Sequence, residues 1–525
     1  MNHPMNPPVR GPRVPQVPPR LDAKQVGSLR QIENIAGQLD GEWTMMGGRC
    51  GLQEDFGAFR YQLAYAGLAL ALAHYHRLPN APGVFKPIFQ NLIRKMMHPG
   101  VWMYWHYVSQ GGALTNGHLW GKVPALWDPV KKDNIMFSAY LTLLPLLYNY
   151  LFDDDRYAKP GALTMAINPL TFGDRMVFEY DQHSLSDTIY WQMVQNGYLG
   201  VACEPSCVFQ ICNQPSILAF RVEDFLKGTT RAQEVTEGYL KAWEEFGMLD
   251  AGAHFMVHVV TDLKVPIPNA LPWLWSDAWL ATMMHSWNPD FVHEHYPRML
   301  EEFLIPGPED TCAIRLWEPV DVRGVKTTAD TADFGWAAVA AAELGDEKTL
   351  RGLLGHADRF MNPTWRDGGL YYPRNDTRYD EQGILRLVEP ITSNTLLPFA
   401  RLNVPSGLNT FYNRPWTRTH FAEPMLTEIS NNVDVVEARF QPAGSELRFT
   451  LKARQDRSGD AEISISNVFE KGRGAWKLYR DGVESASGDD ERVAGTADLR
   501  IERHADVMKL VASREAMSAY TLVWA

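Results

Sequence analysis

A change in the spacing of apolar residues divides this chain of 525 residues into two parts. From about residue 45 to about residue 405, apolar side chains recur mostly at i, i+3 and i+4, the spacing that gives a helix one buried face. After about residue 425, apolar and polar residues alternate, and turn sequences such as RSGD and RDG separate the short runs. The first part is therefore predicted to be helical, and the second to be an antiparallel β-sandwich of roughly 100 residues.

The helical part is predicted to be an (α/α)6 barrel. Its loops are long and aromatic, as in residues 101–129 (VWMYWHYVSQGGALTNGHLWGKVPALWDP), and long loops in compact domains are usually functional. A barrel of paired helices gathers such loops over one open end, where a pocket forms. Helices are expected at 57–78, 83–97, 134–152, 186–197, 232–247, 276–286, 291–303, 332–344, 347–361 and 393–402.

The beginning of the chain is predicted to be an extended arm, because seven of its first twenty residues are proline. The expected units are an arm over 1–44, a barrel over 45–425 and a sandwich over 426–525. The arm contains no apolar run that would make a secretory signal. The longest apolar window, 139–152, is too short to span a bilayer. We therefore expect a cytoplasmic protein without a membrane span.

The composition of the chain argues against one class of partner and leaves two uses open for its large apolar side chains. The chain carries 62 acidic and 50 basic side chains, a net charge of −12, which argues against a nucleic-acid partner. Its 17 Trp, 20 Tyr, 23 Phe and 20 Met suit either a large core or a wide apolar pocket.

Three of the five cysteines lie in the segment CEPSCVFQIC, at Cys203, Cys207 and Cys212. A zinc site needs four ligands, and this spacing has no second pair nearby, so no metal is expected. Two interpretations remain open. The thiols are either small buried groups at the start of a helix, or they line a pocket where the loop-to-helix junction lowers a thiol pKa.

Two other segments contain candidate residues with ordinary structural explanations. Asp55 lies where a helix should begin, so it is equally a helix cap, and Tyr61 follows it by under two turns. Met136 and Tyr140 are four residues apart and share one face of a helix, a pattern that is core more often than pocket.

Taken together, the segments QEDFGAFRYQLAYA, KDNIMFSAY and CEPSCVFQIC resemble the linalool dehydratase/isomerase family over roughly residues 45–405. That family's barrel enzyme interconverts a tertiary allylic alcohol with its primary isomer and dehydrates it to a diene, without a cofactor. The resemblance implies that Cys203 and Cys212 are active-site cysteines and that Met136 is a pocket methionine. It further implies that Asp55 and Tyr61 reach into a neighbouring subunit's site, so that the protein is a homo-oligomer.

The chain also departs from the family. The family's catalytic histidine corresponds to Tyr140, and a phenol with a pKa of about 10 is no substitute for a near-neutral base. His183, in a segment that is longer than the family's, is the candidate replacement. Phe209, Trp273 and Trp275 are expected to line the pocket. The β-sandwich and the missing export signal are further departures.

The expected function is a cofactor-independent lyase or isomerase that acts on a small, apolar, terpenoid-like alcohol. Carbohydrate processing is an alternative, because (α/α)6 barrels followed by β-sandwiches resemble polysaccharide lyases and glycosidases. Trp365, Asp367 and Asp376 are of the residue types that such enzymes need. A non-catalytic protein that binds an apolar ligand is the third possibility.

Overall fold

The computed structural model describes residues 18–48, 58–112, 115–168, 173–270, 273–318, 332–469, 474–489 and 499–524, with short strands at 320–322, 325–327 and 493–495. Asp55 and Cys50 lie outside these residues.

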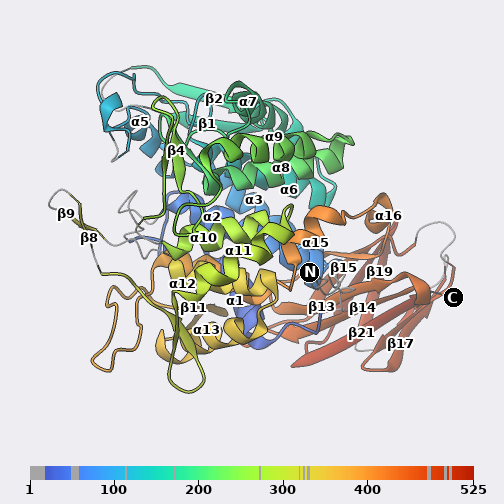
Figure 1. Ribbon diagram of the computed structural model, residues 1–525. Helices are drawn as coiled ribbons and strands as arrows, with labels where there is room; N and C mark the ends of the chain where they lie inside the picture. Colours follow the sequence, from blue (N-terminus) through green and yellow to red (C-terminus); the bar gives the residue numbers. More distant parts are fainter. Residues whose placement is uncertain are drawn as a thin grey trace, which may run out of the picture.

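The described helices form an (α/α)6 barrel, as predicted (Figure 1). The inner helices are apolar on nearly every side, and each contacts the next around a closed ring. A helix without a polar face has to be surrounded by protein, which explains why these segments occupy the centre. The inner ring consists of α2 (Phe59–Leu72), α6 (Ile135–Phe152), α8 (Gln210–Lys227), α10 (Leu274–Met284), α12 (Asp333–Leu344) and α14 (Leu397–Leu402), the last preceded by the π-helical turn η4 (Thr392–Leu396).

The outer helices are amphipathic and cover the inner ring with their apolar faces. Each outer helix precedes an inner one along the chain, so inner and outer helices alternate in sequence. They are α1 (Ala23–Ala36), α3 (Pro82–Met96), α7 (Gln182–Gln195), α9 (Arg231–Phe246), α11 (Pro289–Glu301) and α13 (Glu347–Phe360).

Helix α1 lies within the range 1–44, which was expected to be an extended arm. Asp22 caps this helix, and its side chain accepts a hydrogen bond from the backbone N–H of Gln25. The helix packs on α14, α3 and the strand β11 (Gly369–Tyr371). The arm prediction is therefore wrong for residues 23–36, which supply one of the outer helices of the barrel.

Most of the long connections precede inner helices, so they gather over the end of the barrel where the inner helices begin. We call this end the mouth. Short strands brace these connections, among them a three-stranded sheet of β3 (Cys207–Phe209), β4 (His258–Val260) and β5 (Val265–Ile267). The exception is the long connection from α6 to α7, residues 153–181, which carries β1 (Leu163–Ile167) and β2 (Met176–Tyr180). The connections from α8 to α9 and from α12 to α13, at the opposite end, are only two or three residues long.

Helix α6 has the length and apolar composition of a membrane span, with a mean hydropathy of 1.4 over 18 residues. However, 89% of that stretch is buried inside the protein, as expected for the inner helix of a barrel.

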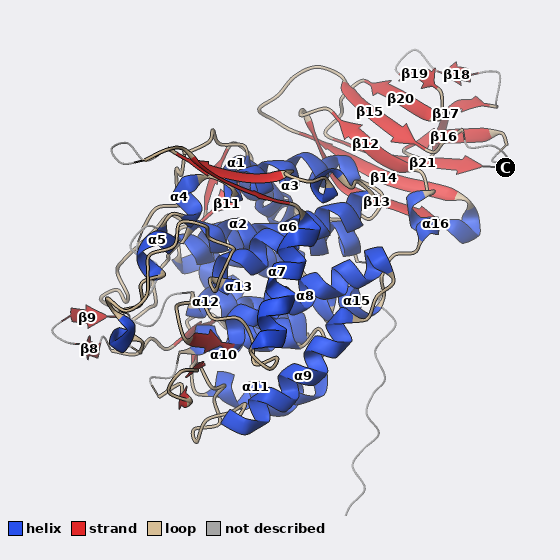
Figure 2. Ribbon diagram, turned by 90° about the horizontal axis from the view of Figure 1, so that it is seen from above, coloured by secondary structure: helices blue, strands red, loops and turns tan. Residues whose placement is uncertain are grey.

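The C-terminal part consists of two antiparallel sheets, as the alternating pattern predicts (Figure 2). One sheet has four strands in the order β12 (Met425–Ile429), β15 (Ala461–Ser466), β20 (Val507–Ala512) and β19 (Leu499–His504). The other has six, in the order β13 (Val433–Gln441), β14 (Glu446–Ala453), β21 (Met517–Trp524), β16 (Trp476–Arg480), β17 (Val483–Gly488) and β18 (Val493–Gly495).

The sandwich is joined to the side of the barrel by hydrogen bonds. Asn80 lies between α2 and α3, and its backbone carbonyl accepts a hydrogen bond from the backbone N–H of Leu426 at 2.8 Å. The side-chain oxygen of Asn80 accepts a second one from the backbone N–H of Phe440, also at 2.8 Å. The backbone N–H of Leu21, before α1, donates to the carbonyl of Val436 at 2.9 Å.

Candidate active site

Aromatic side chains from several inner helices meet near the mouth, on the axis of the barrel. The Tyr61 ring lies edge-on to Tyr140 at 6.0 Å and to Trp279 at 5.6 Å, measured between ring centroids. Tyr65 lies 4.8 Å from Trp336, and Trp336 stacks on Trp279 at 5.5 Å. All five side chains are buried. They form an apolar wall whose ring faces can stabilise positive charge.

The cysteine segment adjoins this wall and is held in a tight turn. The backbone N–H of Cys203 donates to the carbonyl of Cys207 at 2.8 Å, and that of Cys207 donates to Glu204 at 2.9 Å. The backbone N–H of Asn134, just before α6, donates to the carbonyl of Cys203 at 3.0 Å. Cys212 is the third residue of α8. The turn therefore brings Cys203 back to the start of α8, and both thiols are free and buried.

Burial determines the ionisation of the Cys203 thiol. The pKa of Cys203 lies well above its ordinary value, first because the group is buried and second because its thiol is close to that of Cys212. The expectation that the loop-to-helix junction lowers a thiol pKa is wrong for Cys203. At neutral pH its thiol is protonated, so it is a proton donor rather than a nucleophile.

The two phenols of the site are neutral for the same reason. Burial raises the pKa of Tyr61 well above 10, although the Arg60 guanidinium, 4.4 Å above its ring, acts in the opposite direction. Burial also raises the pKa of Tyr140. No hydrogen bond of normal geometry reaches the Tyr140 hydroxyl in the described part of the chain, although the Tyr65 phenol is close.

Met136 lies at the same place, one turn before Tyr140 on α6. Its Sδ atom is 3.6 Å from Nη2 of Arg60, and both side chains are buried. Arg60 also covers the ring of Tyr104 at 4.1 Å. The structure thus brings together Cys203, Cys212, Tyr61, Tyr140 and Met136 from three separate segments.

Tyr61 occupies this site within its own chain. The resemblance implied that the tyrosine at this position reaches into a neighbouring subunit, but here its ring contacts Tyr140 and Trp279 of the same barrel. Asp55, which was expected to act with Tyr61, lies outside the described residues.

The three other predicted aromatic residues lie around the same end of the barrel. Trp273 stacks on Trp275 at 5.9 Å, and Trp275 lies 6.3 Å from Trp279, so the row leads from the loop before α10 to the aromatic wall. Phe209, immediately before α8, stacks on the imidazole of His258 at 4.3 Å. All three are partly exposed rather than fully buried.

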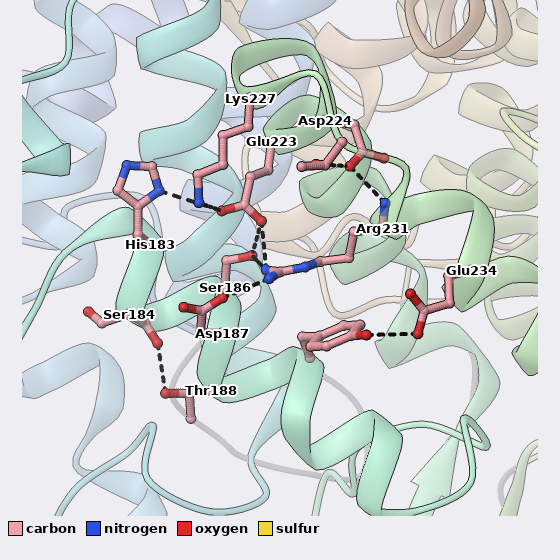
Figure 3. Close-up of polar contacts among 12 residues, drawn as sticks. His183, Ser184, Ser186, Asp187, Thr188, Glu223, Asp224, Lys227, Arg231 and Glu234 are labelled. Carbon is pink, nitrogen blue, oxygen red and sulfur yellow. Dashed lines mark hydrogen bonds and ion pairs between the residues drawn. The ribbon is translucent and has the colours of Figure 1, made fainter.

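His183 lies far from the thiols, in an ion-pair cluster between α7, α8 and α9 (Figure 3). Its Nδ1 atom is 3.5 Å from Oε1 of Glu223. Glu223 follows Cys212 by eleven residues on α8, which corresponds to about 16 Å along the helix axis. The structure therefore does not place His183 where the family's histidine would act.

Sequence reasoning missed several residues of the site. Arg60, Tyr65, Trp279 and Trp336 lie on inner helices, and the helical spacing of large aromatic residues was the available signal. His258 had no such signal, because only the pairing of β4 with β3 brings it to Phe209.

Among the described residues, no group of three His, Cys, Asp or Glu side chains is placed to hold a metal ion. The thiol of Cys207 instead lies 3.5 Å from the hydroxyl of Thr115.

Comparison with known proteins identifies one family and several solved structures that are distantly similar. The model of the family "Linalool dehydratase/isomerase" matches residues 60–378, more than half of the chain. Among solved structures, an inactive variant of the α-1,6-mannanase GH76A of Salegentibacter sp. HEL1_6 is 13% identical, with a TM-score of 0.41, and 73% of this chain and 99% of that chain are covered. An unsaturated glucuronyl hydrolase specific for heparin is 10% identical, with a TM-score of 0.43 and coverage of 72% and 96%. Endoglucanase CelQ from Clostridium thermocellum is 11% identical, with a TM-score of 0.38 and coverage of 96% and 92%. Likenesses this distant say nothing about chemistry.

Proposed function

Because the chain belongs to the linalool dehydratase/isomerase family, we propose that it is a cofactor-independent lyase or isomerase acting on an unsaturated, terpenoid-like alcohol. The observation that supports this most directly is the meeting of neutral proton donors with an aromatic wall. Cys203 and Tyr61 are buried and protonated, and Trp279 and Trp336 lie beside them.

Dehydration of an alcohol without a metal needs an acid for the leaving hydroxyl and an environment that tolerates a cation-like transition state. A buried thiol such as Cys203 can donate a proton to the hydroxyl without first carrying a charge. The ring faces of Trp279 and Trp336 can stabilise the positive charge that develops as the C–O bond breaks. Return of the hydroxyl at another carbon would give isomerisation from the same cation.

The base in this reaction is not Tyr140. Its phenol is neutral and its pKa is raised by burial, so it is poorly suited to accept a proton from carbon. It can hold the substrate hydroxyl, because its own hydroxyl is buried and has no partner of normal geometry in the described part of the chain.

The carbohydrate alternative gains no support from the residues that suggested it. Asp367 and Asp376 are exposed and lie 3.5 Å and 2.8 Å from Arg366 and Arg374, respectively. Trp365 packs against Gly27 of the outer helix α1. Homo-oligomeric assembly and a cytoplasmic location remain predictions.

The test is incubation of the purified protein with tertiary and primary allylic prenyl alcohols, followed by gas chromatography for dienes and isomers. We expect turnover of at least one alcohol. Cys203→Ser should lower kcat by about 10²- to 10⁴-fold, since positioned acids contribute that much. Cys312→Ser is the matched control, because Cys312 is also a free thiol but lies on β7 (Cys312–Ile314), where its Sγ atom donates to Thr349.

Two results would contradict the proposal. One is a thermal midpoint that is raised by oligosaccharides and not by prenyl alcohols, because only a ligand of the native state raises the midpoint. The other is equal turnover by Cys203→Ser and the parent protein.

A further inference from the structure

An imidazole that the proposed mechanism does not yet use lies beside the cysteine turn. His258 is on β4, directly opposite Phe209 of β3, and the two rings stack at 4.3 Å with an interplanar angle of 25°. The backbone N–H of Gln210, the first residue of α8, donates to the carbonyl of Val257. The strand that carries His258 is therefore fixed to the same junction that positions Cys212.

Thr115 connects this imidazole to the cysteine turn. Its hydroxyl oxygen is 3.1 Å from Nε2 of His258 and 3.5 Å from Sγ of Cys207. Cys207 in turn accepts the backbone hydrogen bond of Cys203. Both His258 and Cys207 are buried, with exposed fractions of 4% and 1%, so water does not compete freely for these contacts.

The chemistry of the three groups sets the direction of the two hydrogen bonds. Sulfur is a weak acceptor, whereas an imidazole nitrogen is a good one, so the Thr115 hydroxyl donates to Nε2 and accepts from the Cys207 thiol. This arrangement places the imidazole proton on Nδ1, which is buried and has no hydrogen-bond partner among the described residues.

The charge state of His258 agrees with this arrangement. Burial lowers the pKa of His258 to about 4, so the ring is neutral at neutral pH and the Nε2 lone pair is available. Within the described chain, no carboxylate lies within ion-pair distance of this ring, whereas His183 and His254 lie 3.5 Å and 2.7 Å from Glu223 and Asp277.

We propose that Cys207, Thr115 and His258 form a proton relay in which His258 is the terminal acceptor for the dehydration. This inference rests on the proposed function. His258 is then the base that Tyr140 does not provide, and Cys207 is the third cysteine of the turn to have a role.

In this relay, one proton passes from Cys203 to the leaving oxygen and another from the substrate carbon towards His258. The C–O bond of the alcohol breaks with both electrons on oxygen, and the oxygen takes the proton of the Cys203 thiol and leaves as water. A proton on the carbon next to the resulting cation passes to Sγ of Cys207 while the thiol proton of Cys207 moves to Thr115 and the Thr115 hydroxyl proton moves to Nε2. The C–H electrons form the new double bond. The products are an alkene, water, a Cys203 thiolate and a His258 imidazolium, and proton return through solvent restores both residues.

A weak base is sufficient for this step, because a C–H bond beside a carbocation is strongly acidic. An imidazole with a pKa of about 4 is therefore adequate, although it would be a poor base for a neutral substrate.

The first test measures kcat on the alcohol that gives turnover. Thr115→Val and His258→Gln should each lower kcat by about 10²- to 10⁴-fold with little change in KM. The double variant should be no slower than either single variant, since the residues act in series. Thr115→Ser, which keeps the hydroxyl, should retain most of the activity. Additive losses, or single variants that turn over at the parent rate, would overturn the relay.

The matched control is His356→Gln. His356 on α13 is also buried with a lowered pKa, but its Nε2 atom lies 3.0 Å from the carbonyl of Leu385. Its substitution should affect the melting temperature and not kcat.

The second test needs no turnover and so separates this inference from the proposed function. Histidine-selective ¹⁵N labelling and NMR, with assignment by loss of the signal in His258→Gln, report which ring nitrogen carries the proton. We expect a neutral His258 with the proton on Nδ1 at pH 7 and a shift of the Nε2 signal in Thr115→Val. A proton on Nε2, or an imidazolium at pH 7, would overturn the relay whether or not any alcohol is a substrate.

Discussion

The two ends of helix α8 are both buried and polar, yet they are built in opposite ways. At its beginning, Cys203 and Cys212 are free, buried thiols beside the aromatic wall. At its end, the Glu223 carboxylate is 1% exposed and is held by Lys227 at 2.6 Å and Arg231 at 2.8 Å (Figure 3).

This difference shows how one helix can serve chemistry at one end and stability at the other. Burial would raise the pKa of Glu223, but hydrogen bonds from Lys227 and Ser186 and the charge of Arg231 hold it below its ordinary value. At the other end, burial and the neighbouring Cys212 thiol both raise the pKa of Cys203. Glu223 therefore keeps its negative charge at one end of the helix, and the Cys203 thiol keeps its proton at the other.

The largest expected effect is on stability at the Glu223 end of α8. Glu223→Ala leaves Arg231 and Lys227 without their shared carboxylate, and breaking a buried ion pair costs about 3–5 kcal/mol. Urea unfolding should show a loss near the lower limit, because Lys227 is 37% exposed and can reach water. Cys212→Ala should cost less, and a larger loss there would contradict the comparison.

Alkaline pH should reduce the contribution of the Cys203 thiol to the free energy of unfolding. The folded-state pKa of Cys203 is raised, so its contribution to stability is complete below the unfolded-state value of about 8.5 and is lost as pH rises above it. The loss is about 1.4 kcal/mol per pH unit for one group. The difference in unfolding free energy between the parent and Cys203→Ala should shrink accordingly between pH 8 and pH 10. A constant difference would show that the thiol ionises equally in both states.

Removal of a buried phenol hydroxyl should cost more stability where that hydroxyl is hydrogen-bonded than where it is not. The Tyr372 hydroxyl donates to Asp358 at 2.6 Å and accepts from Arg401 at 2.7 Å, so Tyr372→Phe should cost about 1–3 kcal/mol. Tyr140→Phe should leave the free energy of unfolding within about 0.5 kcal/mol of the parent value, because the Tyr140 hydroxyl has no partner of normal geometry in the described part of the chain. Thermal or urea unfolding of the two variants side by side measures this, and equal losses would be inconsistent with it.

Acid should reduce the contribution of the Glu223 carboxylate to the free energy of unfolding, and this is the smallest of the expected effects. The folded-state pKa of Glu223 is lowered, so its contribution is present above the ordinary glutamate value and is lost as pH falls through the folded-state value. The unfolding free energies of the parent and Glu223→Gln should therefore converge below about pH 4. Divergence in acid would mean that Glu223 is already protonated in the folded protein.

The spacing of apolar residues predicted both fold classes, because burial of one helix face or one strand face leaves a period in the sequence. It failed for α1. That helix follows a proline-rich stretch, and it is held by packing on α14 and on β11, where Gly27 lies too close to Trp365 and Leu370 to carry a side chain. A single surface helix of this kind leaves a weak periodic signal.

The motifs predicted which residues meet at the mouth, but not their environment. Cys203, Cys212, Tyr61, Tyr140 and Met136 converge because they lie near the beginnings of inner helices, which all start at the same end of the barrel. His183 was misplaced because its position depends on Glu223, forty residues later on another helix.

The sequence by itself therefore determined the two fold classes and their order along the chain, and it identified five of the side chains that meet at the mouth of the barrel. Only the tertiary structure decided that Cys203 keeps its proton while Glu223 keeps its charge, and that His258 rather than His183 lies beside the cysteines. The physical reason is that a pKa depends on the water and the charges around a group, and contacts between distant segments of the chain determine both.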